Sequence, residues 1–150
     1  MTIAYGWRAG FDSDALDALH AVGFGHPPEG IDWLARVEQH SLGWVCAHLG
    51  QRLVGFVNVA WDGGTHAFIL DTVVAPEVRG QGVGTSLVSA AGRGARAAGC
   101  TWLHVDYEAG LAGFYQQACG FTPTAAGLVA LSSFNPASGR SPGHVEKASL

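Results

Sequence analysis

The chain has 150 residues, which is the size of one ordinary domain and long enough to bury a hydrophobic core without disulfides or metals. Its net charge of −4 argues against a broad nucleic-acid-binding surface, which needs an excess of basic residues. The sequence has neither a basic, apolar leader nor a run of about 18 apolar residues, so we expect no signal peptide and no membrane span. Cys46, Cys100 and Cys119 are far apart, which predicts buried thiols in a reducing cytoplasm rather than a disulfide framework.

The first half of the chain predicts a strand, two helices and an antiparallel meander. Alternating apolar residues indicate the first strand, and the capping residues Asp12 and Ser13 precede a helix with one apolar face. Tight connections at 50–51 and 62–65 join three strands into hairpins. The predicted elements are a strand over 3–7, a helix from 13 to about 22, a helix over 31–40, and strands over 44–49, 52–61 and 66–74.

The second half predicts a glycine-rich loop followed by alternating helices and strands. These elements are a loop over 75–84, a helix over 85–98, a strand over 102–105, a helix over 111–119 and a last short strand over 128–131. Together the two halves predict a mixed α/β sheet, mostly antiparallel, with helices on both faces. We expect one domain over 1–131 and a polar tail over 132–150, which is rich in serine and poor in large apolar residues.

The loop before the third helix has the composition of an anion site. Gly80, Gly82 and Gly84 alternate between a strand and a helix, so successive N–H groups can point into one concavity. The N-terminus of the helix adds partial positive charge, and Arg79 lies at the mouth of the loop. The simpler interpretation is a glycine-rich turn that only begins the helix.

Two familiar phosphate-binding loops fit this segment poorly. A nucleoside triphosphate loop, GxxxxGK(S/T), needs a lysine that is not there. A dinucleotide fingerprint needs a third glycine where the chain has Thr85, although Asp106 imitates the acid that binds ribose. The antiparallel hairpin before the loop also does not suit a Rossmann half, so a nucleotide oxidoreductase is a weak alternative.

Two motifs resemble those of the GNAT N-acetyltransferase superfamily. The segment Arg79-Gly80-Gln81-Gly82-Val83-Gly84 matches its Q/R-x-x-G-x-G/A signature, and the preceding residues 74–78 are similar to its usual lead-in. Residues 114–121 are similar to its second motif, L/F-Y-x-x-x-G-F, with one extra residue before the glycine. The resemblance covers about residues 1–131 and is most specific over 72–121.

The resemblance implies a sheet that splays between its fourth and fifth strands, 66–74 and 102–105, with acetyl-CoA as co-substrate in the opening. Main-chain groups of Val73 and Val74 would then hold the pantetheine amides, and N–H groups of the loop would hold the pyrophosphate. The implied cofactor-binding residues are Val73, Val74, Arg79, Gly80, Gln81, Gly82, Val83, Gly84 and Thr85.

Tyr115 is the candidate general acid. Its place in the second motif implies that the phenol protonates the thiolate that leaves from a thioester. The alternative is that Tyr115 only packs in an apolar helical stripe with Leu111, Phe114 and Ala118.

Asp71 and Glu108 are the candidate groups for removing a proton from the amine. Asp71 is a lone charge in an apolar strand, where it is costly without a partner or a task. Its alternative is a strand-edge carboxylate bonded to backbone. Glu108 stands where the family often has asparagine, and it is either a polar group of the cleft or a solvated charge at a strand end. His66 and His104 are weaker candidates.

Four aromatic residues are candidates for an acceptor pocket: Phe24, His26, Trp33 and Trp61. A nearby carboxylate, Asp62 or Glu108, could attract a cationic amine. The alternative is that these aromatic side chains belong to the core. The histidines show no metal-ligand spacing, so we expect no metal.

These expectations combine into one functional prediction. The chain is expected to be a cytoplasmic, acetyl-CoA-dependent N-acetyltransferase that acts on a small-molecule primary amine by direct attack in a ternary complex. The alternative is a non-catalytic module of the same fold that binds acyl-CoA or a small ligand. The identity of the amine, and whether the protein is a homodimer, are left open.

Overall fold

The computed structural model describes residues 2–136, and their centre is a five-stranded sheet with the order β1-β2-β3-β4-β5. Neighbouring strands are antiparallel except for β4 and β5, which are parallel. This confirms the predicted mixed, mostly antiparallel sheet. The strands are β1 (Ile3–Trp7), β2 (Gly43–Leu49), β3 (Arg52–Trp61), β4 (His66–Val74) and β5 (Trp102–Val105).

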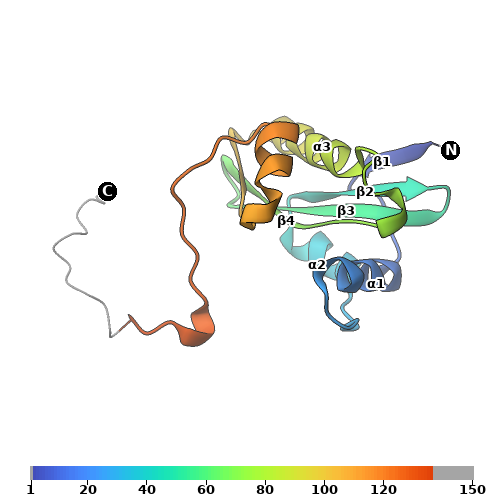
Figure 1. The fold of residues 1–150 in the computed structure, drawn as a ribbon, viewed down its shortest axis with the longest axis horizontal. Coiled ribbons are helices and arrows are strands. Elements are labelled where there is room, and N and C mark those ends of the chain that lie inside the picture. Colours follow the sequence, from blue (N-terminus) through green and yellow to red (C-terminus); the bar gives the residue numbers. More distant parts are fainter. Residues whose placement is uncertain (1, 137–150) are drawn as a thin grey trace.

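Helices cover both faces of the sheet, as Figure 1 shows. Helix α3 (Val83–Ala97) lies on one face, and α1 (Ser13–Phe24) and α2 (Trp33–His40) lie on the other. Alternate side chains of the strands enter two separate hydrophobic clusters. Val57 and Val59 of β3 pack in the α3 cluster, whereas Phe56 packs in the cluster under α1 and α2.

The segment between α1 and α2 is held by a buried carboxylate. Asp17, in the middle of α1, accepts hydrogen bonds from the backbone N–H groups of Gly30 at 2.8 Å and Glu29 at 3.0 Å, and from Trp33 Nε1 at 3.3 Å. Helix α2 begins at Trp33, two residues later than predicted, because Asp32 acts as its N-cap.

We expect Asp17→Ala to lower the melting temperature at pH 7 more than Asp14→Ala, which removes an exposed carboxylate from the same helix. The backbone N–H of Gly30 lowers the pKa of Asp17 below its usual range, with Trp33 and Glu29 contributing, while burial acts in the opposite direction. This stabilisation is present above the unfolded pKa of about 3.9 and is lost as pH falls through the lower, folded pKa. Thermal scans against pH should therefore show wild type and variant converging in acid. Equal melting temperatures at pH 7 would contradict the assignment.

The sheet opens between β4 and β5. Pairing runs from His66 with Trp102 to Ile69 with Val105, and the rest of β4, residues 70–74, has no partner strand on that side among residues 2–136. This confirms the splay between the fourth and fifth strands. On its other side, β4 pairs with β3 through a bulge at Asp71, whose φ of +59° is unusual for a residue that is not glycine.

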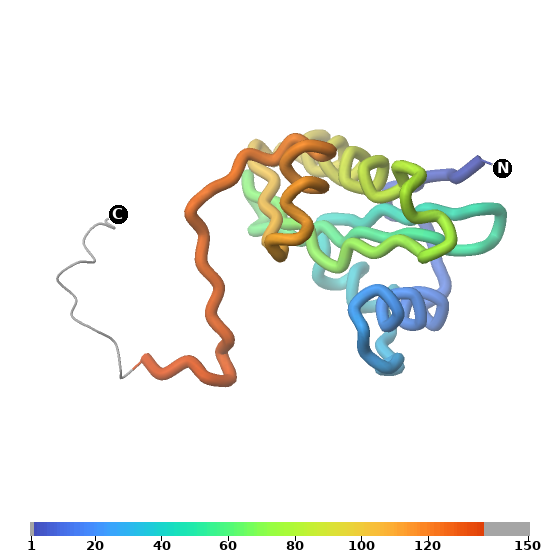
Figure 2. Tube along the Cα trace, viewed as in Figure 1, coloured from blue at the N-terminus to red at the C-terminus, as the bar shows by residue number. Residues whose placement is uncertain are grey.

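Two predicted elements differ from the structure. The strand predicted over 128–131 is wrong: the chain does not pair along β5 but leaves the body of the fold (Figure 2), with Leu128 86% exposed. The α-helix predicted over 111–119 is a 3₁₀ turn (Ala109–Leu111) followed by a π-helix (Gly113–Ala118). The predicted tail falls mainly on residues 137–150, which lie outside the described part of the chain.

Candidate active site

The loop between β4 and α3 presents free backbone N–H groups. Gly80 and Gly82 adopt φ values of +78° and +82°, which turn the chain sharply before α3 begins at Val83. The first helical hydrogen bond of α3 runs from Ser86 N to Gly82 O, so in the described chain the N–H groups of 83–85 have no protein acceptor. These donors, at the positive end of a 15-residue helix, form an anion cradle.

The open edge of β4 next to the cradle is formed by Val74. Ala75 N donates to Val54 O of β3 at 2.8 Å, so the alternation of an antiparallel ladder turns the main-chain groups of Val74 away from β3. Arg79 Nε donates to the Val74 carbonyl at 3.1 Å. The Val74 N–H therefore remains available at the opening. The same alternation directs the main-chain groups of Val73 toward β3, and the Val73 side chain is buried.

The π-helix explains the extra residue in the second motif. Cys119 N donates to Phe114 O at 2.9 Å, five residues back. The hydrogen bond therefore spans one residue more than the corresponding bond of an α-helix. The insertion before Gly120 is absorbed within the helix. Phe114 packs closely against α3 at Gly84, where a Cβ atom would lie 3.0 Å from the Phe114 ring. Gly84 is thus needed for close packing rather than for a positive φ.

Tyr115 lies on the buried side of the π-helix and is only 6% exposed. Its ring stacks on Tyr107 at 5.0 Å and meets Phe114 and Phe121 edge-on. Burial raises the pKa of the Tyr115 hydroxyl, and the nearby hydroxyl of Thr72 acts in the opposite direction. Thr72 Oγ1 is buried in β4 and makes no hydrogen bond of normal geometry to any part of the chain that the structure describes. The Tyr115 hydroxyl is protonated at neutral pH even at the ordinary pKa of a tyrosine, about 10, and burial moves its pKa further from neutrality.

The Asp71 carboxylate is turned toward α1 and both of its oxygens have partners. Oδ1 lies 3.0 Å from His20 Nε2, and Oδ2 accepts from Asn58 Nδ2 at 3.2 Å. Asn58 in turn accepts a hydrogen bond from Ser41 at 2.6 Å. The bulge makes this possible: Ile69 faces α3, so regular alternation would also turn Asp71 toward α3.

The other base candidates lie apart from Asp71. Glu108 is exposed at the N-terminal end of the 3₁₀ turn that follows β5, and its side chain makes no hydrogen bond or ion pair within residues 2–136. His66 and His104 contact each other across β4 and β5, with 2.7 Å between Nδ1 and Nε2. His104 also stacks on the exposed ring of Phe68.

The four predicted acceptor-pocket residues do not form one wall. Phe24 is exposed and His26 half-buried on the α1 side, but Trp33 is only 2% exposed and belongs to the core beneath them. Trp61 lies at the end of β3, three residues after Asn58 in regular register, so its side chain faces α3. The prediction of a common pocket is therefore wrong for Trp33 and Trp61.

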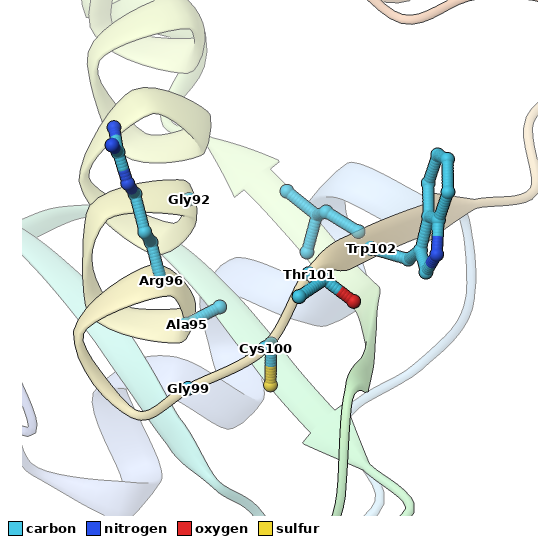
Figure 3. Close-up of a pocket in the computed structure, with 8 residues that line it drawn as sticks. Gly92, Ala95, Arg96, Gly99, Cys100, Thr101 and Trp102 are labelled. Carbon is cyan, nitrogen blue, oxygen red and sulfur yellow. The ribbon is translucent and has the colours of Figure 1, made fainter.

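A cleft of about 1100 Å³ opens beside β5 and reaches from the splay to α3. Leu70, Thr85, Tyr107 and Cys119 are among its lining residues. A smaller hollow of about 510 Å³ lies at the far end of α3, where Arg96 extends along the helix and Trp102 turns away from it (Figure 3). The larger cleft adjoins the cradle and the Tyr115 helix, so it is the candidate site, and Asp71 lies outside its lining, on the α1 side of the splay.

The family model of the acetyltransferase (GNAT) family matches residues 9–121. The chain belongs to the GNAT family. No curated protein matches the sequence significantly. Within residues 2–136 of this GNAT chain, no helix is long and apolar enough to cross a membrane. The same residues contain no group of three or more His, Cys, Asp or Glu side chains that could hold a metal ion.

Solved structures resemble this GNAT chain over most of its length. A GNAT-family acetyltransferase of Streptococcus pneumoniae has a TM-score of 0.66 and 24% identity, covering 87% of this chain and 98% of its own. Glucosamine-6-phosphate N-acetyltransferase of Arabidopsis thaliana has a TM-score of 0.67 and 17% identity, and the match covers 85% of this chain and 97% of the plant enzyme. The aminoglycoside N-acetyltransferase AAC(6')-Iy, bound to a bisubstrate analogue, has a TM-score of 0.68 and 20% identity, and the match covers 87% of this chain and 97% of that enzyme.

Sequence reasoning missed three residues of this candidate site. His20 and Asn58 hold the Asp71 carboxylate, and Thr72 lies beside Tyr115. His20 gave no signal because its partner is 51 residues away. The helical periodicity of α1 places His20 next to the apolar face formed with Leu16 and Leu19, which was the one available hint.

Proposed function

We propose that this protein is an acetyl-CoA-dependent N-acetyltransferase that acts on a primary amine of a small molecule. One observation carries the proposal: the unpaired stretch of β4, residues 70–74, has the Asp71 carboxylate at one end and the anion cradle of α3 at the other. A pyrophosphate in the cradle would let the thioester reach the splay. The known structures of AAC(6')-Iy with CoA and with a bisubstrate analogue support this reading.

Each residue has a chemical task in the proposed reaction. The amine nitrogen attacks the thioester carbonyl after its ammonium form has passed a proton to Asp71. A C–N bond forms, and the C–S bond breaks as the tetrahedral centre collapses. Tyr115 gives its proton to the departing thiolate, and the tyrosinate takes a proton from the nitrogen, which became positively charged when the C–N bond formed. The Val74 N–H can hold an amide carbonyl of the pantetheine arm along β4.

Direct attack is favoured over an acyl-enzyme because the thiols are poor nucleophiles. Burial raises the pKa of Cys46 to about 12, and burial also raises the pKa of Cys100 and Cys119. We expect Cys119→Ala, the variant of the thiol that lines the cleft, to leave turnover unchanged. Intact-mass measurement after incubation with acetyl-CoA alone should show no acetylated protein. An acetyl group on Cys119, with loss of turnover in the variant, would contradict direct attack.

The test of the function is CoA release from acetyl-CoA with a panel of primary amines, including aminoglycosides and amino sugars. We expect steady thiol release that depends on both substrates, with initial velocities that intersect as a ternary complex requires. Acetyl-CoA binding without turnover of any amine would instead support the acyl-CoA-binding module.

The cytoplasmic location rests on the three reduced cysteines and stays a prediction.

A further inference from the structure

Three side chains form a hydrogen-bonded chain from the bulge of β4 to the surface. His20 Nε2 lies 3.0 Å from Asp71 Oδ1, and His20 Nδ1 lies 3.0 Å from His26 Nε2. His26 Nδ1 lies 2.8 Å from the carbonyl oxygen of Pro27. Asp71, His20 and His26 are called the histidine chain below. The side chains at its ends are 26% and 28% exposed, but the central His20 is only 13% exposed.

The three hydrogen bonds of the histidine chain need one proton more than its two neutral imidazole rings supply. The Pro27 carbonyl and the Asp71 carboxylate only accept, so the three hydrogen bonds need three protons, and two neutral imidazoles supply two. Pro27 fixes a proton on His26 Nδ1, which leaves His26 Nε2 to accept from His20. With both rings neutral, the lone pair of His20 Nε2 therefore faces Asp71. A proton that arrives at Asp71 fills this vacancy.

The surroundings hold the central ring in place. The His20 ring stacks on Phe24 at 4.3 Å and contacts Trp33 at 4.8 Å. Gly23 lets α1 approach β4, because a Cβ atom there would collide with Val73. With so little freedom, His20 keeps one nitrogen toward Asp71 and the other toward His26.

Within residues 2–136, three charged side chains lie near the histidine chain besides its own members. Asp17, one turn before His20 on α1, accepts from Trp33 Nε1, whose ring contacts His20. Glu29 lies 3.9 Å from His26 Nδ1 at the exposed end, and the Arg36 guanidinium lies over the Trp33 ring, 5.0 Å from its centroid. From β3, only the amide of Asn58 contacts Asp71. A proton that leaves through His26 therefore meets an acidic side chain and solvent rather than a cation.

We propose that His20 and His26 are positioning residues that, through Asp71, carry the ammonium proton of the amine to solvent. This inference rests on the proposed function. Asp71 receives the proton from the ammonium group and passes it to His20 Nε2. His20 Nδ1–H then transfers its proton to His26 Nε2, and His26 Nδ1–H releases one to water beside Glu29. One proton enters and one leaves, and no redox partner is needed.

The first test is independent of turnover. Nitrogen-15 NMR of the histidine rings should show His26 as the Nδ1–H tautomer, with a hydrogen-bond coupling between His20 Nδ1 and His26 Nε2. Asp71→Asn provides an N–H donor for His20 Nε2, so the nitrogen-15 shift of His20 Nε2 should change while the coupling between the two rings is kept. Absence of that coupling, or a His20 Nε2 shift that is unchanged in Asp71→Asn, would overturn the histidine chain.

The second test is kinetic and uses the surface end of the chain. We expect His26→Ala to lower kcat/KM for the amine by about 10²-fold at pH 7, with a smaller loss at higher pH, where more amine is already neutral. The KM for acetyl-CoA should not change. Added imidazole should restore part of kcat, which a purely structural role of His26 would not allow. His40→Ala, at the exposed end of α2, is the matched control and should behave as wild type.

The outcomes separate this inference from the function on which it rests. If wild type acetylates amines but His26→Ala keeps the wild-type pH profile and does not respond to imidazole, the histidine chain is wrong and the function stands. If wild type acetylates no amine, the proposed function fails, and the proton-transfer role fails with it.

Discussion

Gly82→Asp should abolish measurable CoA binding. The residue lies immediately before α3, where a new side chain would enter open space beside the free N–H groups of 83–85. Its carboxylate would compete with the pyrophosphate for those donors and would repel it. Hydrogen bonds to charged groups contribute about 1.5–3 kcal/mol each, so each one lost weakens binding by about 10- to 150-fold. Calorimetric titration with CoA measures the loss directly.

Gly82→Asn is the matched control for this experiment. Asparagine and aspartate have the same shape, and both tolerate the left-handed φ of +82° better than other side chains. The backbone strain is therefore shared, and only the charge differs. We expect Gly82→Asn to bind CoA more weakly than wild type but much more tightly than Gly82→Asp. Equal affinities of the two variants would show that charge at the cradle is irrelevant, and an unchanged affinity of Gly82→Asp would remove the cradle from the account.

Tyr115→Phe should lower turnover by about 10²- to 10⁴-fold, the range of a positioned general acid. The stacking on Tyr107 and the edge contacts with Phe114 and Phe121 need only the ring, so the fold and the affinity for acetyl-CoA should be kept. Burial raises the pKa of Tyr115, so the wild-type enzyme keeps its acid at pH 7 and loses it only in alkali. Thiol-release assays against pH measure the effect.

The pH dependence distinguishes the acid role of Tyr115 from a packing role. A CoA thiolate leaves more easily without a proton as pH rises, so the deficit of Tyr115→Phe should shrink toward pH 8 and above. If the hydroxyl only stabilises the fold, the loss should be about 1 kcal/mol of unfolding free energy with turnover intact. A variant with normal turnover at pH 7 would exclude Tyr115 from the mechanism.

The sequence predicted those parts of the site that depend on local chain geometry. Gly80 and Gly82 after a strand predicted the sharp turn that leaves N–H groups free at the start of α3, because a turn and a helix N-terminus are encoded by adjacent residues, and anion binding there stays a prediction. Helical and strand periodicity predicted the element order and the two-sided cover of the sheet. The same signals located Tyr115 in its helix, although not the π-helical form of that helix.

Side-chain directions that depend on irregular backbone could not be predicted. The bulge in β4 turns Asp71 from the α3 side to the α1 side, and no residue of the strand is a glycine that would mark it. His20 is brought to Asp71 by tertiary packing of α1, so neither sequence position indicates the other. The direction of the Trp61 side chain could have been predicted, because regular alternation along β3, counted from Asn58, places Trp61 on the α3 face.

The strand predicted over 128–131 failed for a different reason. Its apolar residues have the local composition of a strand, but pairing needs the chain to return along β5. After Ala126, the last residue that lines the cleft, the chain instead leaves the fold (Figure 2), and Leu131 is 76% exposed. Composition alone therefore predicted an element that the path of the chain does not form.

The most direct test of the whole account is to follow an isotopically labelled acetyl group from acetyl-CoA. Mass spectrometry of the products after reaction with a primary amine should show the label on the amine nitrogen, formed in equal amount with free CoA thiol, in wild type and not in Gly82→Asp. Tyr115→Phe should form the same product much more slowly. Label that is found only in acetate, or thiol release that is independent of the amine, would contradict an N-acetyltransferase.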